Sequence, residues 1–487
     1  MNSTLFKSTI FERCNNMNLP FQNKINLPQS LWLLVYSVLV LFSLDHIFFW
    51  DTVQLASKQA HFFYENGFRN PILPQEIDSG HPPFFGWMLA LSWICFGKSL
   101  AVSHLFMLPW VGCMVIFVHK VADDFLGKTW GMWGAGLILL DPTLMAQSSL
   151  VSPDVLVVAG FLIGLHGIMN EKKYAVLIGA LLCALISNRG AMIVVALMVW
   201  QWFLLYRKNP GNSHFIKSTL PFLPALFIFG SFQLWHFWKT GWIGYHDQSP
   251  WAPSFDRVSP IIMLKNFLLV AWRMADFGRW IVGLGIIIIA LMKGISIIRS
   301  KESHHLLSLG MVLSMVLLPS MIIHAGLTGH RYLLPLIILM NLLVMRWISS
   351  YLTKKWAKIV TLVLAISLIT GNLWIYPRGV AQGWDSSMAH WPYFQLHASM
   401  NRYLSINGIK ISDVGCSFPN TAYQKYLDLS ASIQKHADKD LNTNPYFLYS
   451  NIFNDITQQE YNLLDRNYRP VHRLNKGGIE MVLYQKK

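Results

Sequence analysis

Long apolar runs alternate with short polar turns from about Leu31 to Tyr376. Runs near 20 residues with few charges are long enough to cross a bilayer as helices. Counting them over residues 29–376 predicts a polytopic α-helical membrane protein with about 11 transmembrane helices. The runs with clear limits are 30–50, 101–119, 130–146, 150–169, 218–238, 305–325 and 357–376, and the run 174–206 is a hairpin cut at Ser187-Asn188-Arg189-Gly190.

One apolar run is too short to span. Phe84–Phe96 has about 13 residues, so we expect an interfacial or re-entrant helix. The positions of the basic residues support leaving it out of the count, because lysine and arginine gather on cytoplasmic loops. With eleven spans, the N-terminal segment 1–28 and the basic turns are cytoplasmic, and the C-terminus is outside. These turns contain Lys120, Lys128, Lys172, Lys173, Arg207, Lys208, Lys354 and Lys355.

Residues 377–487 are polar and differ from the apolar part of the chain. Helical patterns occur near 393–405, 422–435 and 458–467, and strand-like runs occur at 446–450 and 479–485. This predicts a small soluble α/β domain on the extracytoplasmic side of the membrane. A transmembrane domain, 29–376, therefore precedes a soluble one, 377–487.

Composition agrees with a membrane protein. Of 487 residues, 53% are hydrophobic and 13% are charged. The formal charge of +15 follows from the basic cytoplasmic turns, so we expect no nucleic acid partner. The five cysteines show no metal-ligand or paired spacing. The pattern predicts an integral protein of the inner (plasma) membrane, which we take to be bacterial.

Ionisable residues collect on the predicted outer face. Two long outer loops are expected, 51–83 and 239–276, and several helix ends reach the same side. Charged groups near lipid are costly unless they are paired or solvated, and they are often functional. The candidate site residues are Asp51, Asp78, His81, Asp154, Arg189, His330 and Arg331.

These residue types suit transfer to a hydroxyl group from a phosphate-bearing donor. A carboxylate takes the proton from an acceptor hydroxyl. Arginine binds a phosphate through paired donors and stabilises the charge that grows on it. We therefore expect an active site for a hydroxyl nucleophile and a phosphate, with the outer loop 51–83 as one of its walls.

Four features resemble the GT-C superfamily of polyprenyl-phosphate-sugar-dependent glycosyltransferases, which includes protein O-mannosyltransferases and lipid A aminoarabinose transferases. They are Asp51 after the first span, Pro82-Pro83, Ser152-Pro153-Asp154, and Arg331-Tyr332-Leu333-Leu334-Pro335. The resemblance implies a GT-C-like fold with Asp51 as the acceptor-activating base. It also implies that Asp154 is a second catalytic or positioning carboxylate and that Arg331 binds the lipid phosphate. Aminoarabinose transferases carry an acidic residue and lysine before Pro-Pro, whereas this chain has Gly80-His81.

Each of these residues also has a structural reading. Asp51 is a suitable N-cap, and Asp154 follows Pro153 at a helix start. His81 can anchor the turn before Pro82. Arg189 can extend to lipid headgroups, and Arg331 can be an interfacial anchor.

Two other classes of function remain open. A polytopic transporter is one, although transporters tend to place ionisable groups near the bilayer midplane and to show repeated halves. A non-enzymatic protein of envelope polysaccharide assembly is the other. No cofactor is required by the pattern, and no metal site is expected. Asp51, Asp78 and Asp154 are nevertheless able to hold a divalent cation. The expected partners are a polyprenyl-phosphate-linked sugar and a lipid, glycan or protein acceptor.

Overall fold

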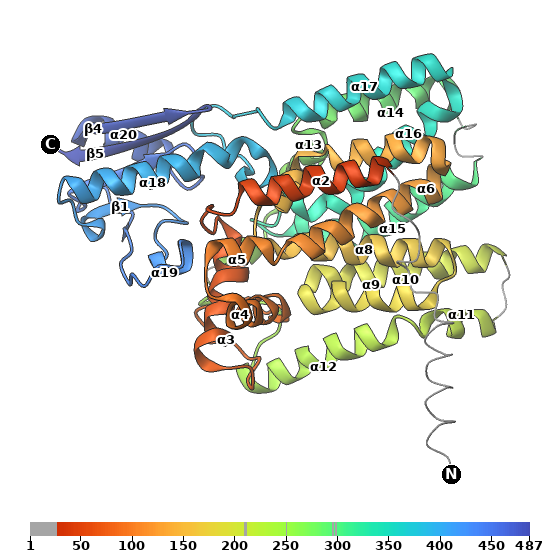
Figure 1. The fold of residues 1–487 in the computed structure, drawn as a ribbon, viewed down its shortest axis with the longest axis horizontal. Coiled ribbons are helices and arrows are strands. Elements are labelled where there is room, and N and C mark those ends of the chain that lie inside the picture. Colours follow the sequence, from red (N-terminus) through yellow and green to blue (C-terminus); the bar gives the residue numbers. More distant parts are fainter. Residues whose placement is uncertain (1–26, 209–211, 250, 295–296, 298–299) are drawn as a thin grey trace, which may run out of the picture.

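Helices of the apolar region form an elongated bundle, and a small sheet lies at one end of it (Figure 1). The computed structural model describes residues 27–208, 212–249, 251–294, 297 and 300–487. The predicted cytoplasmic segment 1–28 therefore lies almost wholly outside the described residues.

The longer helices of the bundle are α2 (Leu27–Phe42), α6 (Leu108–Leu139), α8 (Pro153–Met169), α9 (Lys173–Ile186), α10 (Asn188–Lys208), α12 (Leu223–Thr240), α13 (Pro260–Ala275), α14 (Arg279–Lys293), α15 (Lys301–Ile323), α16 (Leu334–Tyr351) and α17 (Lys354–Gly371). The shorter elements are the π-helix η1 (Val53–Lys58), the α-helices α3 (Gln59–Asn66), α4 (Phe84–Phe96), α5 (Leu100–Leu105), α7 (Pro142–Ser149) and α11 (Asn212–Thr219), and the 3₁₀ turns η2 (Ala252–Phe255) and η4 (His330–Leu333).

Several helical stretches have the length and composition of membrane spans. In the described part of the chain there are four: Leu100–Leu139, Asn188–Lys208, Lys301–Ile323 and His330–Tyr351. A fifth is formed if α13 and α14, which are bent by 95°, count as one span. Leu27–Phe42, Phe84–Phe96, Pro153–Met169 and Lys173–Ile186 are shorter apolar helices. These helices identify an integral membrane protein, and the count of eleven spans stays a prediction.

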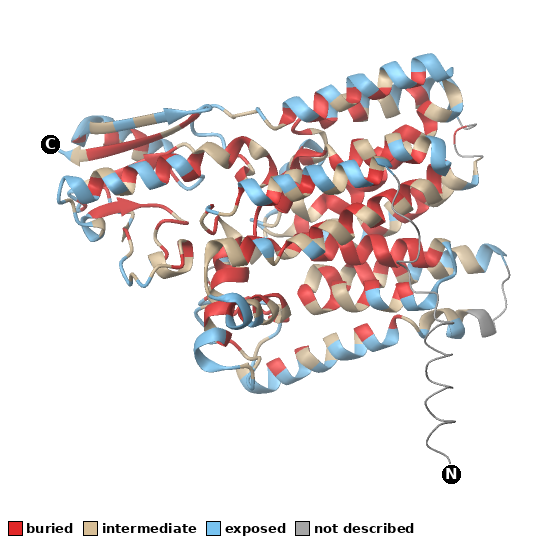
Figure 2. Cartoon of the chain, in the orientation of Figure 1, coloured by how far each residue is buried: buried red, intermediate tan, exposed pale blue. Residues whose placement is uncertain are grey.

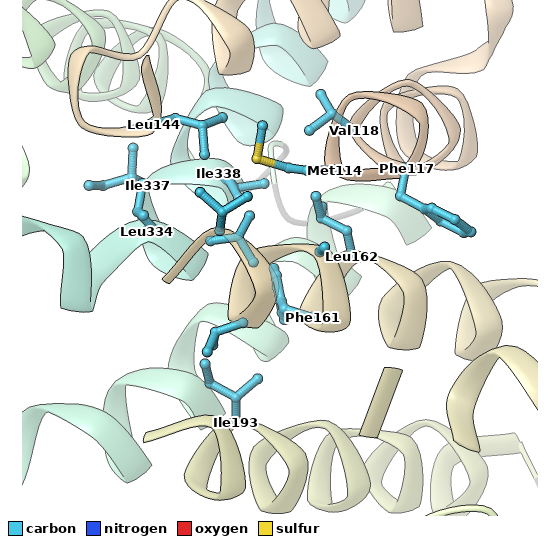
Figure 3. Close-up of a cluster of buried hydrophobic side chains, with 14 of the residues drawn as sticks. Met114, Phe117, Val118, Leu144, Phe161, Leu162, Ile193, Leu334, Ile337 and Ile338 are labelled. Carbon is cyan, nitrogen blue, oxygen red and sulfur yellow. The ribbon is translucent and has the colours of Figure 1, made fainter. Parts of the chain in front are cut away.

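The core of the bundle is built around α8. Its side chains are buried from Asp154 to Ile168, which is expected of a helix that is apolar all round. Figure 2 shows the buried residues concentrated in the central helices, with exposed residues along α12 and α17. Figure 3 shows Phe161 and Leu162 of α8 among side chains from neighbouring helices, such as Met114, Leu144 and Ile337.

The C-terminal region contains a five-stranded sheet in the order β2-β1-β3-β5-β4. Its strands are β1 (Val414–Cys416), β2 (Ala437–Asp438), β3 (Tyr446–Ser450), β4 (Tyr468–Lys476) and β5 (Ile479–Lys486). β1 is parallel to β2 and β3, whereas β5 is antiparallel to β3 and β4. The other elements here are α18 (Trp391–Ile406), α19 (Gln424–Leu427), α20 (Gln458–Asn467) and the 3₁₀ turns η5 (Trp384–Ser386), η6 (Met388–His390) and η7 (Ile411–Asp413). A second hydrophobic cluster, which includes Phe447, Leu448 and Leu483, fills this region and also takes in Phe49 and Leu150.

In two segments, the secondary structure differs from the one predicted from the sequence. The outer loop predicted over 239–276 contains the helix α13, because Ile261, Leu264 and Leu268 follow a helical spacing that the surrounding Trp, Pro and Asp residues obscure. The helix predicted over 422–435 is reduced to α19. Backbone amides of Gln424 and Lys425 donate to the carbonyls of Gln434 and Ser432, which folds this segment back on itself.

Candidate active site

Arg331 in η4 is the centre of a cluster of three carboxylates from distant parts of the chain. Its Nη2 donates to Asp51, just before η1, and its Nη1 donates to Asp385 in η5. Its Nε lies 3.3 Å from Asp154 Oδ2 at the start of α8. The Arg331 side chain is 9% exposed, so the cluster neutralises a cation that is almost removed from solvent.

A second arginine joins the same cluster. Arg189, near the start of α10, donates from Nη1 to Asp154 Oδ1 at 3.1 Å. Its guanidinium carbon lies 3.5 Å from the centre of the Tyr332 ring, which is a close cation–π contact. Tyr332 also accepts a hydrogen bond from Arg331 Nη2 at 3.1 Å. Tyr332 therefore separates and orients the two arginines.

Local sequence places the two predicted carboxylates. Ser152 is the N-cap of α8 and accepts from the backbone amide of Asp154 at 3.2 Å. Asp154 is thus in the first turn, and its carboxylate is directed to the arginines. Before η1, Thr52 Oγ1 accepts from the amide of Phe49 at 2.9 Å. The bonds of Asp51 to Arg331 and of Asp154 to Arg189 differ from those of a helix cap.

A cavity of about 170 Å³ lies against this cluster. Its polar lining includes Asp51, Ser79, His81, Asn188 and Arg189. Its other walls include Met192 of α10, Leu317 and Met321 of α15, and Tyr245, Trp251 and Phe255 of the loop 241–259. Arg331, Asp154 and Asp385 are not among the lining residues. Asp51 and Arg189 therefore present their charges to the cavity, while Arg331 lies behind Asp51.

Buried polar contacts hold the loop 51–83 against α12 and against the loop 241–259. Asp78 Oδ2 lies 2.8 Å from His236 Nε2, and both side chains are at most 3% exposed. His246 Nε2 is 3.0 Å from the carbonyl of Gln75. Gly80 has φ +65°, and a Cβ there would lie 2.2 Å from the carbonyl oxygen of Gly244. Asp78, predicted to bind substrate, thus holds the loop 51–83 against α12.

The two predicted histidines have different positions. His81 lines the cavity, and burial together with Arg189 lowers the pKa of its imidazole to about 4, so it is neutral near pH 7. His330 is fully buried, and its Nε2 lies 2.7 Å from Asp276 Oδ2. His330 therefore fixes the chain immediately before Arg331 and does not line the cavity.

Sequence reasoning missed Asp385. This residue follows the last apolar run in a segment that the sequence assigns to a separate soluble domain. Its position could have indicated a role in the site, because it follows soon after that run and lies on the same predicted side of the membrane as Asp51 and Arg331. Burial opposes its ionisation, but Arg331, Ser386 and nearby histidines together hold the pKa of Asp385 below its usual value.

Among the described residues, there is no group of three or more His, Cys, Asp or Glu side chains that could hold a metal ion. The three carboxylates of the cluster surround a guanidinium, and Asp78 is engaged with His236. The cation site considered from Asp51, Asp78 and Asp154 does not form in this structure.

No protein-family model matches the chain, and no curated protein matches it. Among solved structures, the chain is similar to ArnT from Cupriavidus metallidurans, in a complex with undecaprenyl phosphate and in the apo state. Both comparisons have 12% identity and cover 93% of this chain and 97% of the other. The TM-scores are 0.47 for the complex and 0.49 for the apo state. Similarity at this level determines neither the family nor the substrate of this chain.

Proposed function

We propose that the protein is an integral membrane glycosyltransferase of the GT-C type. It would move a sugar from a polyprenyl-phosphate carrier to the hydroxyl group of a lipid, glycan or protein acceptor at the outer face of the membrane. The observation that carries this proposal is that Asp51 and Arg189 line the same cavity, and each of them is paired within the carboxylate–arginine cluster behind it. The order of the sequence motifs around Asp51, Asp154 and Arg331 supports the same class.

In this proposal, Asp51 is the general base. Its carboxylate accepts the proton of the acceptor hydroxyl as that oxygen bonds to the anomeric carbon of the sugar. The bond between the anomeric carbon and the phosphate oxygen breaks, and the polyprenyl phosphate leaves with one more negative charge than it had as a diester. Arg189 faces the cavity and is the better placed of the two arginines to stabilise that charge.

Arg331 has a different role in the proposed site. It contacts Asp51, Asp154 and Asp385 at once and does not line the cavity. Three carboxylates close together would repel one another without it. We assign Arg331 to holding Asp51 and Asp154 in place, whereas the sequence resemblance implies that Arg331 binds the phosphate.

The aromatic wall suits the sugar or the first isoprene units of the donor. Tyr245 and Phe255 stack with ring centroids 4.5 Å apart, and Trp251 lines the same cavity. Aromatic faces bind both sugar rings and apolar chains, with a few polar groups fixing the orientation. The divide between polar and aromatic walls therefore matches a donor with a polar head and an apolar tail.

The test is sugar transfer from a polyprenyl-phosphate-linked donor by the purified full-length protein. Asp51→Asn keeps the size of the side chain and removes the proton acceptor. The variant should be expressed normally and bind donor, but transfer about 100- to 10,000-fold more slowly. Asp247→Asn makes the same chemical change at an exposed outer-loop residue and should leave transfer unchanged. Transfer within a few-fold of wild type by Asp51→Asn would rule out the base role.

A further inference from the structure

The segment 382–391 joins the helical bundle to the C-terminal sheet and runs across the candidate active site. Two side chains of α7 donate hydrogen bonds to consecutive backbone carbonyls of this segment. Gln147 Nε2 donates to the carbonyl of Asp385 at 2.7 Å, and Thr143 Oγ1 donates to the carbonyl of Ser386 at 3.1 Å. The position of the Asp385 backbone is therefore set by the bundle itself.

A close approach fixes the same segment against η4. A Cβ at Gly383 would lie 2.5 Å from His330 Nδ1, so only glycine fits there without displacement of the ring. His330 is in turn held by Asp276, at 2.7 Å. The residue before Arg331 and the segment that contains Asp385 are thus packed as one unit.

Further contacts anchor this segment on the side of the sheet. Phe49 stacks on His390 with ring centroids 5.0 Å apart, and Trp391 Nε1 donates to Ser149 Oγ at 3.2 Å. Phe49 and Leu150 belong to the hydrophobic cluster of the C-terminal region. The two residues closely precede Asp51 and Asp154 in the chain, so the packing of the C-terminal core also supports these two carboxylates.

The Asp385 carboxylate, held in this position, contacts one edge of the Arg331 guanidinium. Asp385 contacts Nη1, whereas Asp51 contacts Nη2. Ser386 Oγ donates to the other oxygen of Asp385 at 3.0 Å, which fixes the orientation of the carboxylate. Arg331 Nε lies near Asp154 but makes no hydrogen bond. One guanidinium therefore donates to Asp51 and Asp385 and lies within ion-pair distance of Asp154.

We propose that Asp385 is a positioning residue of the active site, which is completed by the C-terminal segment. Asp385 holds Nη1 of Arg331, and this limits how strongly Arg331 neutralises Asp51. A carboxylate that is less completely neutralised by its arginine is a stronger proton acceptor. The inference rests on the proposed function, in which Asp51 is the base, and it gives the C-terminal region a part in the chemistry.

The charged and titratable groups around Asp51 decide the sign of the effect. Arg331 and Tyr332 come from η4, Arg189 from α10, Asp154 from α8, and His81 from the loop 51–83. Asp385 comes from η5. Loss of the Asp385 charge removes a like charge from the neighbourhood of Asp51 and leaves Arg331 with only Asp51 and Asp154 to neutralise. Both changes make Asp51 a weaker proton acceptor.

The variant Asp385→Asn tests this in the full-length protein. We expect kcat to fall roughly tenfold, because a weaker base contributes less to proton transfer. The acid limb of the kcat–pH profile should move to lower pH by about half a unit to one unit. The KM for the donor should change little. Asp385→Glu restores the charge and should recover most of the rate and the position of the limb.

Asp438→Asn is the matched control, because Asp438 is 80% exposed on β2 in the same region. It should have the wild-type profile. If Asp385→Asn keeps the wild-type acid limb, or if Asp385→Glu fails to recover it while both variants unfold thermally at the wild-type temperature, the positioning role is wrong. Wild-type protein without any transfer from polyprenyl-phosphate sugars would instead contradict the proposed function. The two failures are therefore distinguishable.

Discussion

The two arginines of the site differ in what they face, and this difference is testable residue by residue. Arg189 lines the cavity and makes one ion pair, whereas Arg331 is enclosed by carboxylates. We expect Arg189→Ala to raise the KM or Kd for the donor about 10- to 100-fold, since a charged hydrogen bond contributes about 1.5–3 kcal/mol. Arg189→Lys should restore part of this, because lysine lacks the paired donors of guanidinium.

Arg331→Ala should act mainly on kcat and on stability, because it leaves Asp51, Asp154 and Asp385 without their common partner. Steady-state kinetics with varied donor separates the two effects. Arg466→Ala, at an exposed position on α20, is the control for loss of an arginine elsewhere. If Arg331→Ala raises the KM for the donor and Arg189→Ala leaves it unchanged, then Arg331 binds the phosphate, as the sequence resemblance implies.

Four residues of the cluster could be predicted from the sequence. Asp51, Asp154, Arg189 and Arg331 stand at the ends of apolar runs, where a charge near lipid needs a partner, and the predicted topology puts them on one side. Side-chain partners were not predictable in the same way. Asp78 looks similar in the sequence, yet its carboxylate pairs with His236 from α12, which is 158 residues away.

At the scale of elements, the buried histidines of the C-terminal region, among them His397 and His436, predict acid sensitivity. Burial lowers the pKa of His397 to about 4, and burial together with His397 lowers the pKa of His436 to about 3. Unfolded histidine has a pKa near 6.5, so between these values the unfolded chain binds protons that the folded one does not. Stability is therefore complete above about pH 6.5 and falls as the pH decreases, by about 2 kcal/mol per histidine at pH 5.

Hydrogen exchange of residues 391–487 in the full-length protein, corrected for intrinsic rates, measures this loss between pH 7.5 and pH 5. His436→Gln removes one of these groups and should reduce the acid-induced loss of stability at pH 5 by about 2 kcal/mol. His472→Gln, which changes a half-buried histidine stacked on Tyr403, should leave the loss as in wild type. If His436→Gln and wild type lose the same amount of stability between pH 7.5 and pH 5, a group other than His436 is responsible for the loss.

Elements with a strong local pattern were predictable, and those set by distant partners were not. The apolar run Phe84–Phe96, the break before Asn188, the strand Tyr446–Ser450 and the helix Gln458–Asn467 appear at their expected positions. Thr457 and Glu460 form a capping box that fixes the start of that last helix. β4 was missed because it pairs along its length with β5 and carries Pro470 and a register shift.

At the scale of the whole molecule, the sheet and the bundle are joined through the site. Phe49 and Leu150, which belong to the C-terminal cluster, are anchored beside Asp51 and Asp154. The segment with Asp385 returns from the last bundle helix to the same place. Dividing the sequence at residue 377 by composition cannot reveal this contact between the two regions. Composition indicates whether a segment lies in lipid or in water, but not which other segments it packs against.

The orientation of the molecule in the membrane is the last prediction. The basic turns at Lys172 and Lys354 are expected on the cytoplasmic side, and the sheet with Asn442 is expected outside. In a background without the native cysteines, a single cysteine at Lys172, exposed in the turn before α9, should be shielded from an impermeant thiol reagent in intact cells. A cysteine at Asn442, also exposed, should be labelled, and both should react after the cells are permeabilised.

The same experiment decides where the acceptor must approach. Asp385 lies in the segment that leads into the sheet, so the face on which Asn442 is labelled is the face on which Asp51 and Arg189 meet the cavity. Labelling at Asn442 alone would put the proposed transfer outside the cytoplasm, where only a lipid-linked donor carried across the membrane is at hand. Labelling at Lys172 alone would invert the chain and place the site in the cytoplasm. Soluble nucleotide sugars would then be available as donors, and this result would contradict the proposed polyprenyl-phosphate donor.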